Sequence, residues 1–321
     1  MQTELDSMVA SARAPLGASE LVVPNNDGHQ VRFELFHAAN SICSQKVRVV
    51  LAHHGLAYRS NSMDIRAGDT YLPDYVRLRM AACALEGLPL VSDHSGSTSV
   101  QATGCDPAVV PLLVDWKARR LVIDSKRICI YLDGVAATGS PLRPEALADA
   151  IDDELEAVDG LPNYQMLVGK APDERGLPAS RTSGTGVAFA MSKVERCDHY
   201  LKEFAGDDVL ERAFRAKRAK ERAAAERLFT PQAMKAAYDQ AEAACQRLEE
   251  KLAGSSTRWL YANVISMADQ FWAIELLRMK NLGAQMLWAD GARPNVEAFV
   301  RQCEAEASIR SAVLDWPGAL F

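Results

Sequence analysis

The fold can be worked out from residues 41–48, Ser41-Ile42-Cys43-Ser44-Gln45-Lys46-Val47-Arg48. A short alternating run of polar and apolar residues precedes this stretch at 32–36 and predicts a β-strand. Apolar residues at helical spacing follow it as far as Gly55, which predicts a helix that ends there. Ser41 is then the expected N-cap, and Cys43 lies in the first turn, where unpaired backbone N–H groups point outward. A strand, a tight turn and a thiol at a helix start are typical of a reactive site.

The chemistry expected of Cys43 follows from its place at the helix start. The positive end of the helix dipole, together with the nearby Lys46 and Arg48, predicts a lowered pKa for the thiol and hence a reactive thiolate. The alternative is a buried structural cysteine, because free cysteine is among the most buried residue types. The spacing alone leaves both interpretations open.

Three motifs that occur in order along the chain resemble landmarks of the cytosolic glutathione S-transferases. The first is Ser41-x-Cys43 with the basic pair that follows it, a pattern of the zeta-like branch. The second is Val109-Val110-Pro111, and the third is Asp124-Ser125 at an expected strand-to-helix turn. The first motif, taken together with Tyr75-Val76-Arg77-Leu78, resembles more closely the glutathione-dependent reductive dehalogenases of chlorinated hydroquinones.

The resemblance implies an α/β thioredoxin-like domain followed by an all-α domain. The first would span residues 31–136 and bind glutathione, with helices on one face of a four-stranded mixed sheet. It would carry a long insertion near 80–106. The second would span 145–321 and supply most of the substrate pocket. Residues 1–30 lack the apolar stretch of a signal peptide and are expected to form a flexible arm.

Roles for individual residues come from the same resemblance. Ser41 would stabilise the glutathione thiolate, and Cys43 would attack the sulfur of a glutathionyl conjugate. A cis bond between Val110 and Pro111 would let the backbone grip the cysteinyl part of glutathione. The pair Asp124-Ser125 would hold its γ-glutamyl end.

The activity implied is glutathione-dependent reductive removal of chloride from a chlorinated hydroquinone. Glutathione would be the co-substrate, a small aromatic molecule the substrate, and the enzyme a homodimer. Three alternatives stay open: a zeta-like cis–trans isomerase of a maleyl acid, a glutathione transferase that cleaves β-aryl ethers, and a non-enzymatic binding module. The module is disfavoured because it would not need Ser41, Cys43 and the Asp124-Ser125 pair together.

Composition narrows the possible partners. The chain has 321 residues, of which 48% are hydrophobic and 24% charged, as in ordinary globular proteins. Its net charge of −6 argues against general nucleic-acid binding. The seven cysteines are widely spaced and odd in number, which predicts no disulfide framework and favours a reducing cytoplasm. We expect no metal site, because no metal-ligand spacing occurs, and no membrane span, because no apolar run is long enough.

The insertion and the C-terminal half carry weaker signals. Residues 92–104 are rich in turn formers and predict either a lid over the glutathione site or, as the preferred interpretation, a solvated loop. The charged stretch 208–228 predicts a solvated helix rather than a basic docking surface. Ser266 and Asp269 predict a capping box at the start of a helix. Four aromatic residues could line a substrate pocket, although a place in the core is the preferred interpretation: Trp259, Tyr261, Phe271 and Trp272.

Overall fold

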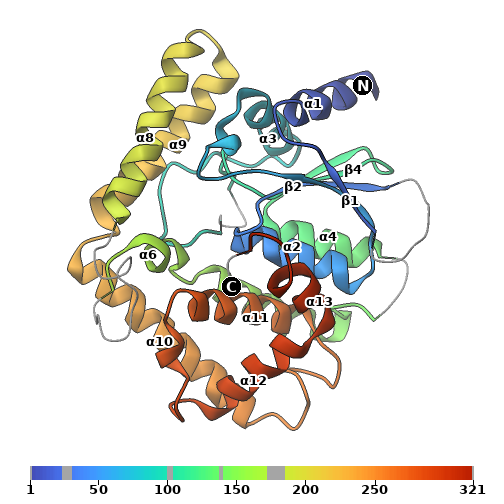
Figure 1. Cartoon of the computed structure of the whole chain (residues 1–321), viewed down its shortest axis with the longest axis vertical. Helices are drawn as coiled ribbons and strands as arrows, with labels where there is room; N and C mark the ends of the chain where they lie inside the picture. Colours follow the sequence, from blue (N-terminus) through green and yellow to red (C-terminus); the bar gives the residue numbers. More distant parts are fainter. Residues whose placement is uncertain (1, 24–30, 100–103, 137–139, 172–184, 320–321) are drawn as a thin grey trace.

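The computed structural model describes residues 2–23, 31–99, 104–136, 140–171 and 185–319. An α/β part comes first and a helical part follows it, which confirms the predicted fold class (Figure 1). The elements of the first part are α1 (Gln2–Arg13), β1 (Glu20–Val22), β2 (Phe33–His37), α2 (Ile42–His53), β3 (Tyr58–Ser62), α3 (Pro73–Leu85), β4 (Leu112–Asp115), β5 (Arg120–Ile123) and α4 (Ser125–Val135). The helices of the second part are α5 (Ala148–Asp159), α6 (Asn163–Val168), α8 (Gly186–Glu203), α9 (Asp208–Arg227), α10 (Pro231–Ala253), α11 (Met267–Asn281), α12 (Pro294–Ala305) and α13 (Ala307–Ile309).

In the described part of the chain, the sheet has five strands in the order β1-β3-β2-β4-β5. Strands β2 and β3 run parallel, whereas β1, β4 and β5 run antiparallel to their neighbours. The prediction of four strands was therefore wrong by one. Strand β1 was missed because a strand of three residues is too short to show a periodic pattern.

Helices cover both faces of the sheet, and not one face as predicted (Figure 1). Alternate residues of a strand point to opposite faces, so β4 contributes to two cores. Leu113 packs in the core that contains α2, α4 and α11, whereas Leu112 and Val114 pack in the core that contains α1 and α3. Helix α2 is thus enclosed between the sheet and α11 of the second part.

The N-terminal residues do not form a flexible arm, so this prediction was wrong for residues 2–23. Helix α1 packs on α3 and buries Val9 and Ala12. Leu5, Met8 and Leu16 pack around them, and this spacing is a helical pattern that the sequence already contains.

Two of the cysteines are joined, although the spacing predicted no disulfides. Cys83 in the last turn of α3 is bonded to Cys105, with their Cα atoms 6.2 Å apart. Cys105 forms a parallel β-bridge with Leu90, which lies shortly after the end of α3. This pairing places Cys105 beside Cys83. The bond closes the base of the insertion onto α3.

The start of α11 has the predicted capping box. The Ser266 hydroxyl accepts from the backbone N–H of Asp269, and the Asp269 carboxylate accepts from the backbone N–H of Ser266. Both residues are buried, so the box fixes where α11 begins within the helical core.

Candidate functional site

Ser41 and Cys43 begin α2 at the junction of the two parts of the chain. The Ser41 hydroxyl accepts from the backbone N–H of Ser44 at 3.3 Å, which confirms the predicted N-cap. Cys43 is only 6% exposed. Arg48, which was expected to lower the pKa of the thiol, instead donates to the carbonyl of Ala312 at 2.9 Å. It is therefore a structural residue that ties α2 to the C-terminal helices.

The pKa of the Cys43 thiol is raised, not lowered as predicted. Burial is the main cause, and the attraction of Lys46 offsets it only in part. The Lys46 ammonium lies 2.6 Å from the Asp159 carboxylate, whose negative charge disfavours a nearby thiolate. The helix start alone could not show this, because Asp159 lies 113 residues further along the chain.

The loop before β4 lies opposite Cys43. The peptide bond between Val110 and Pro111 is cis, as predicted. Arg79 of α3 holds this loop, since its guanidinium donates to the carbonyl of Pro111 at 2.8 Å and to that of Asp106 at 2.9 Å. Arg79 is itself buried, and its hydrogen bonds fix the loop to α3 of the α/β part.

The pair Asp124-Ser125 begins α4 on the third side of the site. Asp124 is the N-cap, with φ of 74°, and its carboxylate accepts from the backbone N–H of Arg127 at 3.3 Å. Burial and the charge of Asp159 raise the pKa of Asp124 to about 6. The buried Ser125 hydroxyl has no hydrogen-bond partner among the described residues. A free hydroxyl at a helix start is suited to bind a carboxylate.

The structure brings five of the six predicted site residues to one cavity, namely Cys43, Val110, Pro111, Asp124 and Ser125. Ser41 is two residues from Cys43 but does not line the cavity. The cavity has a volume of about 10 Å³, which is room for one water molecule at most.

Residues 94–99 of the insertion fill the space beside Cys43. The thiol donates to the carbonyl of Thr98 at 3.7 Å, and the Ser99 hydroxyl lies 3.6 Å from the sulfur. His94, Ser97 and Ser99 are buried. The preferred prediction of a solvated loop was therefore wrong for this segment, while residues 100–103 of the same prediction lie outside the described part of the chain.

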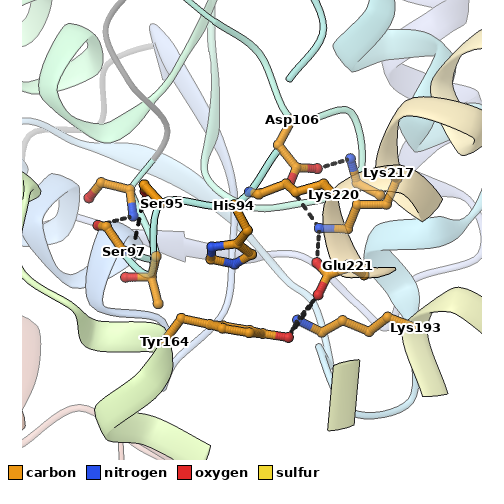
Figure 2. A network of polar contacts seen from close by, with 12 residues as sticks. His94, Ser95, Ser97, Asp106, Tyr164, Lys193, Lys217, Lys220 and Glu221 are labelled. Carbon is orange, nitrogen blue, oxygen red and sulfur yellow. Dashed lines mark hydrogen bonds and ion pairs between the residues drawn. The ribbon is translucent and has the colours of Figure 1, made fainter. Parts of the chain in front are cut away.

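A network of buried charges links α9 to the loop before β4. The Asp106 carboxylate accepts from Lys217 at 2.8 Å and from Lys220 at 2.9 Å (Figure 2). Although burial alone would raise it, these two ammonium groups hold the pKa of Asp106 well below its usual range. Helix α9 is thus not a solvated helix as predicted, because three of its charged residues face inward: Lys217, Lys220 and Glu221.

The network continues from α9 to α6 and to the insertion. The Glu221 carboxylate accepts from the Tyr164 hydroxyl at 2.7 Å and lies 3.5 Å from the Lys193 ammonium (Figure 2). The ring of His94 packs on that of Tyr164, with centroids 4.3 Å apart. Three lysines and two carboxylates therefore join α8, α9 and the loop before β4, and through Tyr164 they reach the insertion.

Another buried carboxylate, that of Glu275 in α11, lies near Lys46 of α2. It accepts from the Asn163 side chain at 2.8 Å and is within the field of Lys46. Burial raises the pKa of Glu275 to about 7. Sequence reasoning missed Asp159, Asp106 and Glu275, since each stands in an ordinary helix or loop pattern and becomes notable only through its distant partners.

The raised pKa of Glu275 predicts a pH-dependent stability. A carboxyl whose folded pKa lies above its usual 4.5 stabilises the fold below pH 4.5, and this contribution is lost as the pH rises through 7. We expect Glu275→Gln, which cannot ionise, to gain roughly 1–3 kcal/mol relative to the wild type between pH 5 and pH 8. Urea unfolding of both proteins at the two pH values measures this gain. A constant difference would show that Glu275 does not titrate in this range.

The four aromatic residues do not line the cavity beside Cys43. Trp259 packs edge-on against Phe299, and the Trp272 ring nitrogen donates to a glutamate of α5. Phe271 lies under the Lys46 ammonium, 4.6 Å from its ring centroid. The preferred prediction of core packing is confirmed for Trp259, Phe271 and Trp272, which are buried.

Among the described residues, no group of three or more His, Cys, Asp or Glu side chains is placed to hold a metal ion. None of the described helices is both long and apolar enough to cross a membrane.

Comparison with known proteins decides the family. Residues 40–135 match the family described as glutathione S-transferase, N-terminal domain. A relative from Sphingobium indicum named 2,5-dichlorohydroquinone reductive dechlorinase is 36% identical over 290 residues, which cover 89% of this chain and 84% of the relative. The chain belongs to the glutathione S-transferase family. It is an enzyme of the glutathione S-transferase type, and this confirms the family to which the three motifs pointed.

Solved structures of the glutathione S-transferase fold resemble this transferase. The β-etherase LigF from Sphingobium sp. strain SYK-6 superposes with a TM-score of 0.57 at 16% identity, over 88% of this chain and 98% of that one. Glutathione S-transferase III in its apo form gives a TM-score of 0.52 at 19% identity, over 89% and 97%. At these identities the two structures show a shared fold.

Proposed function

We propose that this transferase removes chloride reductively from a chlorinated hydroquinone, with glutathione as co-substrate. The observation that carries the proposal is the meeting of the Cys43 thiol, Pro111 and the Asp124-Ser125 pair at one cavity. The buried Ser125 hydroxyl without a partner supports binding of an amino-acid carboxylate there. The reductive dechlorinase named above supports the substrate class. Ure2p, whose structure is a complex with glutathione, supports the co-substrate, since it shares the fold with a TM-score of 0.50.

The first step would join glutathione to the ring. The glutathione thiolate attacks the chlorine-bearing carbon of the ketone tautomer, a carbon–sulfur bond forms, and chloride leaves. A hydrogen bond donated by Ser41 would stabilise the thiolate and lower its pKa. The Ser41 hydroxyl already accepts from the Ser44 N–H, and this leaves its own proton available to donate.

The second step would reduce the ring. The Cys43 thiolate attacks the sulfur of the conjugate, the carbon–sulfur bond breaks, and the ring carbon takes up a proton. This leaves Cys43 joined to glutathione in a mixed disulfide. A second glutathione thiolate attacks the glutathione sulfur of that disulfide, releasing oxidised glutathione and the Cys43 thiolate. The positive charge of Lys46, which acts to lower the pKa of the Cys43 thiol, would favour the thiolate in both exchanges.

A direct assay tests the proposal. Purified protein is incubated with glutathione and a panel of chlorohydroquinones that includes 2,5-dichlorohydroquinone, and free chloride and reduced products are measured. We expect one chloride and one oxidised glutathione for each ring reduced. Absence of chloride release across the panel would contradict the proposal and favour the isomerase or the ether-cleaving reaction. Two related predictions can be tested on the same sample: a homodimer, by light scattering, and a cytoplasmic location, by fractionation of the source cells.

The role proposed for Ser41 predicts a slower first step in Ser41→Ala. We expect chloride release in a single turnover to slow on the order of 10²-fold, the effect of losing one donor to a developing or bound anion. The same change removes an N-cap and should cost about 1 kcal/mol of stability. Ser41→Thr keeps both the hydroxyl and the cap and is the matched control. Equal rates in all three proteins would assign Ser41 to capping alone.

The role proposed for Asp124 predicts weaker glutathione binding in Asp124→Ala. Loss of a buried charge-assisted pair should reduce the affinity by roughly 2–4 kcal/mol in calorimetric titration. Asp124→Asn keeps an acceptor for the N–H of Arg127 and separates the effect of charge from that of capping. Unchanged affinity in Asp124→Ala would mean that Asp124 only caps α4.

A further inference from the structure

The segment from His94 to Ser99 occupies the place where glutathione would have to bind. The Thr98 carbonyl and the Ser99 hydroxyl both contact the Cys43 sulfur. The cavity lined by Cys43, Thr98 and Pro111 has a volume of about 10 Å³. Pockets for ligands of the size of a tripeptide need roughly 300 Å³ or more. Glutathione therefore cannot enter unless this segment moves.

Asp159, the last residue of α5, holds the segment to the helical part through two hydrogen bonds, which we call the latch. Its carboxylate accepts from the Ser99 hydroxyl at 3.0 Å, and its backbone carbonyl accepts from the Ser97 hydroxyl at 2.6 Å. The Ser97 oxygen in turn accepts from the backbone N–H of Ser99 at 3.0 Å. The Asp159 carboxylate also accepts from Lys46, so one side chain holds both the segment and the cation beside the thiol.

The other end of the segment is anchored on α6. The backbone N–H of Tyr164 donates to the carbonyl of Gly96 at 2.9 Å, and the ring of His94 packs on the Tyr164 ring (Figure 2). Gly96 has φ of +92°, and a side chain added there would come within 2.3 Å of the Gln165 amide oxygen. The positive φ favours glycine, and the short distance to Gln165 shows that the segment lies directly against α6.

We propose that residues 94–99 form an internal plug, which takes the place of glutathione in the resting enzyme and which glutathione displaces on binding. This inference rests on the proposed role of glutathione as co-substrate. A lid would close over a bound ligand, whereas this segment contacts the reactive sulfur itself. While it is in place, the Cys43 thiol is shielded from other electrophiles and oxidants. The affinity for glutathione is reduced by the fraction of molecules in which the plug is closed.

Hydrogen exchange followed by mass spectrometry tests the displacement. We expect glutathione to speed exchange in peptides that cover residues 94–99 on the order of tenfold, and to slow it in peptides that cover 123–128. Slower exchange of residues 94–99 in the presence of glutathione would identify a lid and overturn the plug.

A matched pair of variants tests the latch without glutathione. Ser97→Ala removes the hydrogen bond to the Asp159 carbonyl and does not touch Cys43, whereas Ser92→Ala changes an exposed serine of the same region. We expect iodoacetamide to alkylate Cys43 on the order of tenfold faster in Ser97→Ala than in the wild type or Ser92→Ala, with thermal unfolding measured on all three. Equal alkylation rates would overturn the plug.

Calorimetry on the same variants separates the two proposals. Tighter glutathione binding by Ser97→Ala than by the wild type supports the plug. If neither protein binds glutathione, the co-substrate role fails and the plug for glutathione fails with it, even if Cys43 is alkylated faster. If both proteins bind equally well, the co-substrate role stands and the plug is overturned.

Discussion

Cys43→Ser is expected to release chloride and yet form almost no reduced hydroquinone. If Cys43 attacks the conjugate, the variant lacks the sulfur that breaks the carbon–sulfur bond. Formation of reduced ring should fall by roughly 10³-fold or more, as is usual when a covalent nucleophile is removed. Mass spectrometry should show a glutathionyl-hydroquinone that accumulates with each chloride released.

A second cysteine of the same core provides the control for this experiment. Cys129 is fully buried in the core that also contains Cys43, and it does not line the cavity. Cys129→Ser should therefore leave the product pattern unchanged, at some cost in stability. Normal reduced product from Cys43→Ser would remove the mixed-disulfide step and favour a reaction that needs a single thiol addition.

Asp106→Ala is expected to lose about 3–5 kcal/mol of unfolding free energy, the range for breaking a buried ion pair. The variant removes the carboxylate that the buried ammonium groups of Lys217 and Lys220 share, and it leaves the ion pair between Lys217 and Glu221. Denaturant unfolding measures the loss. Glutathione affinity should fall as well, because the Asp106 backbone is part of the loop that ends at Pro111.

An exposed ion pair at the surface provides the comparison for the buried ion pairs of Asp106. The exposed pair of Lys235 and Asp239 should contribute no more than about 1 kcal/mol, so Asp239→Ala is the matched variant. Because the folded pKa of Asp106 is depressed below 3.8, its contribution is complete above that pH and is lost as the pH falls further. A loss in Asp106→Ala as small as that in Asp239→Ala would show that the lysines find other partners or water.

The motifs could be placed from the sequence because each depends on neighbours a few residues away. The Ser41 cap and the Ser266 capping box both satisfy backbone N–H groups within three residues. The parallel pairing of β2 with β3 likewise follows from two strands separated by one helix.

The features that the sequence did not reveal depend on contacts between distant segments. Helix α9 carries the charge pattern of a solvated helix, and the pattern does not show that Asp106 meets its lysines across 111 and 114 residues. Cys105 lies beside Cys83 because it pairs with Leu90, near the end of α3. The segment 94–99 has the composition of a loop. It is held in a buried position by hydrogen bonds to Asp159 and Tyr164, which lie far along the chain.

The sequence by itself determined the family, the two-part fold and five residues that meet at the cavity, because their order and local geometry are encoded within short stretches. The tertiary structure alone decided the state of that site. Helix geometry predicts a thiolate at Cys43, yet burial and the Asp159 carboxylate raise the pKa of the thiol. The protonation of a group depends on its desolvation and on every charge within reach, and folding brings those from anywhere along the chain.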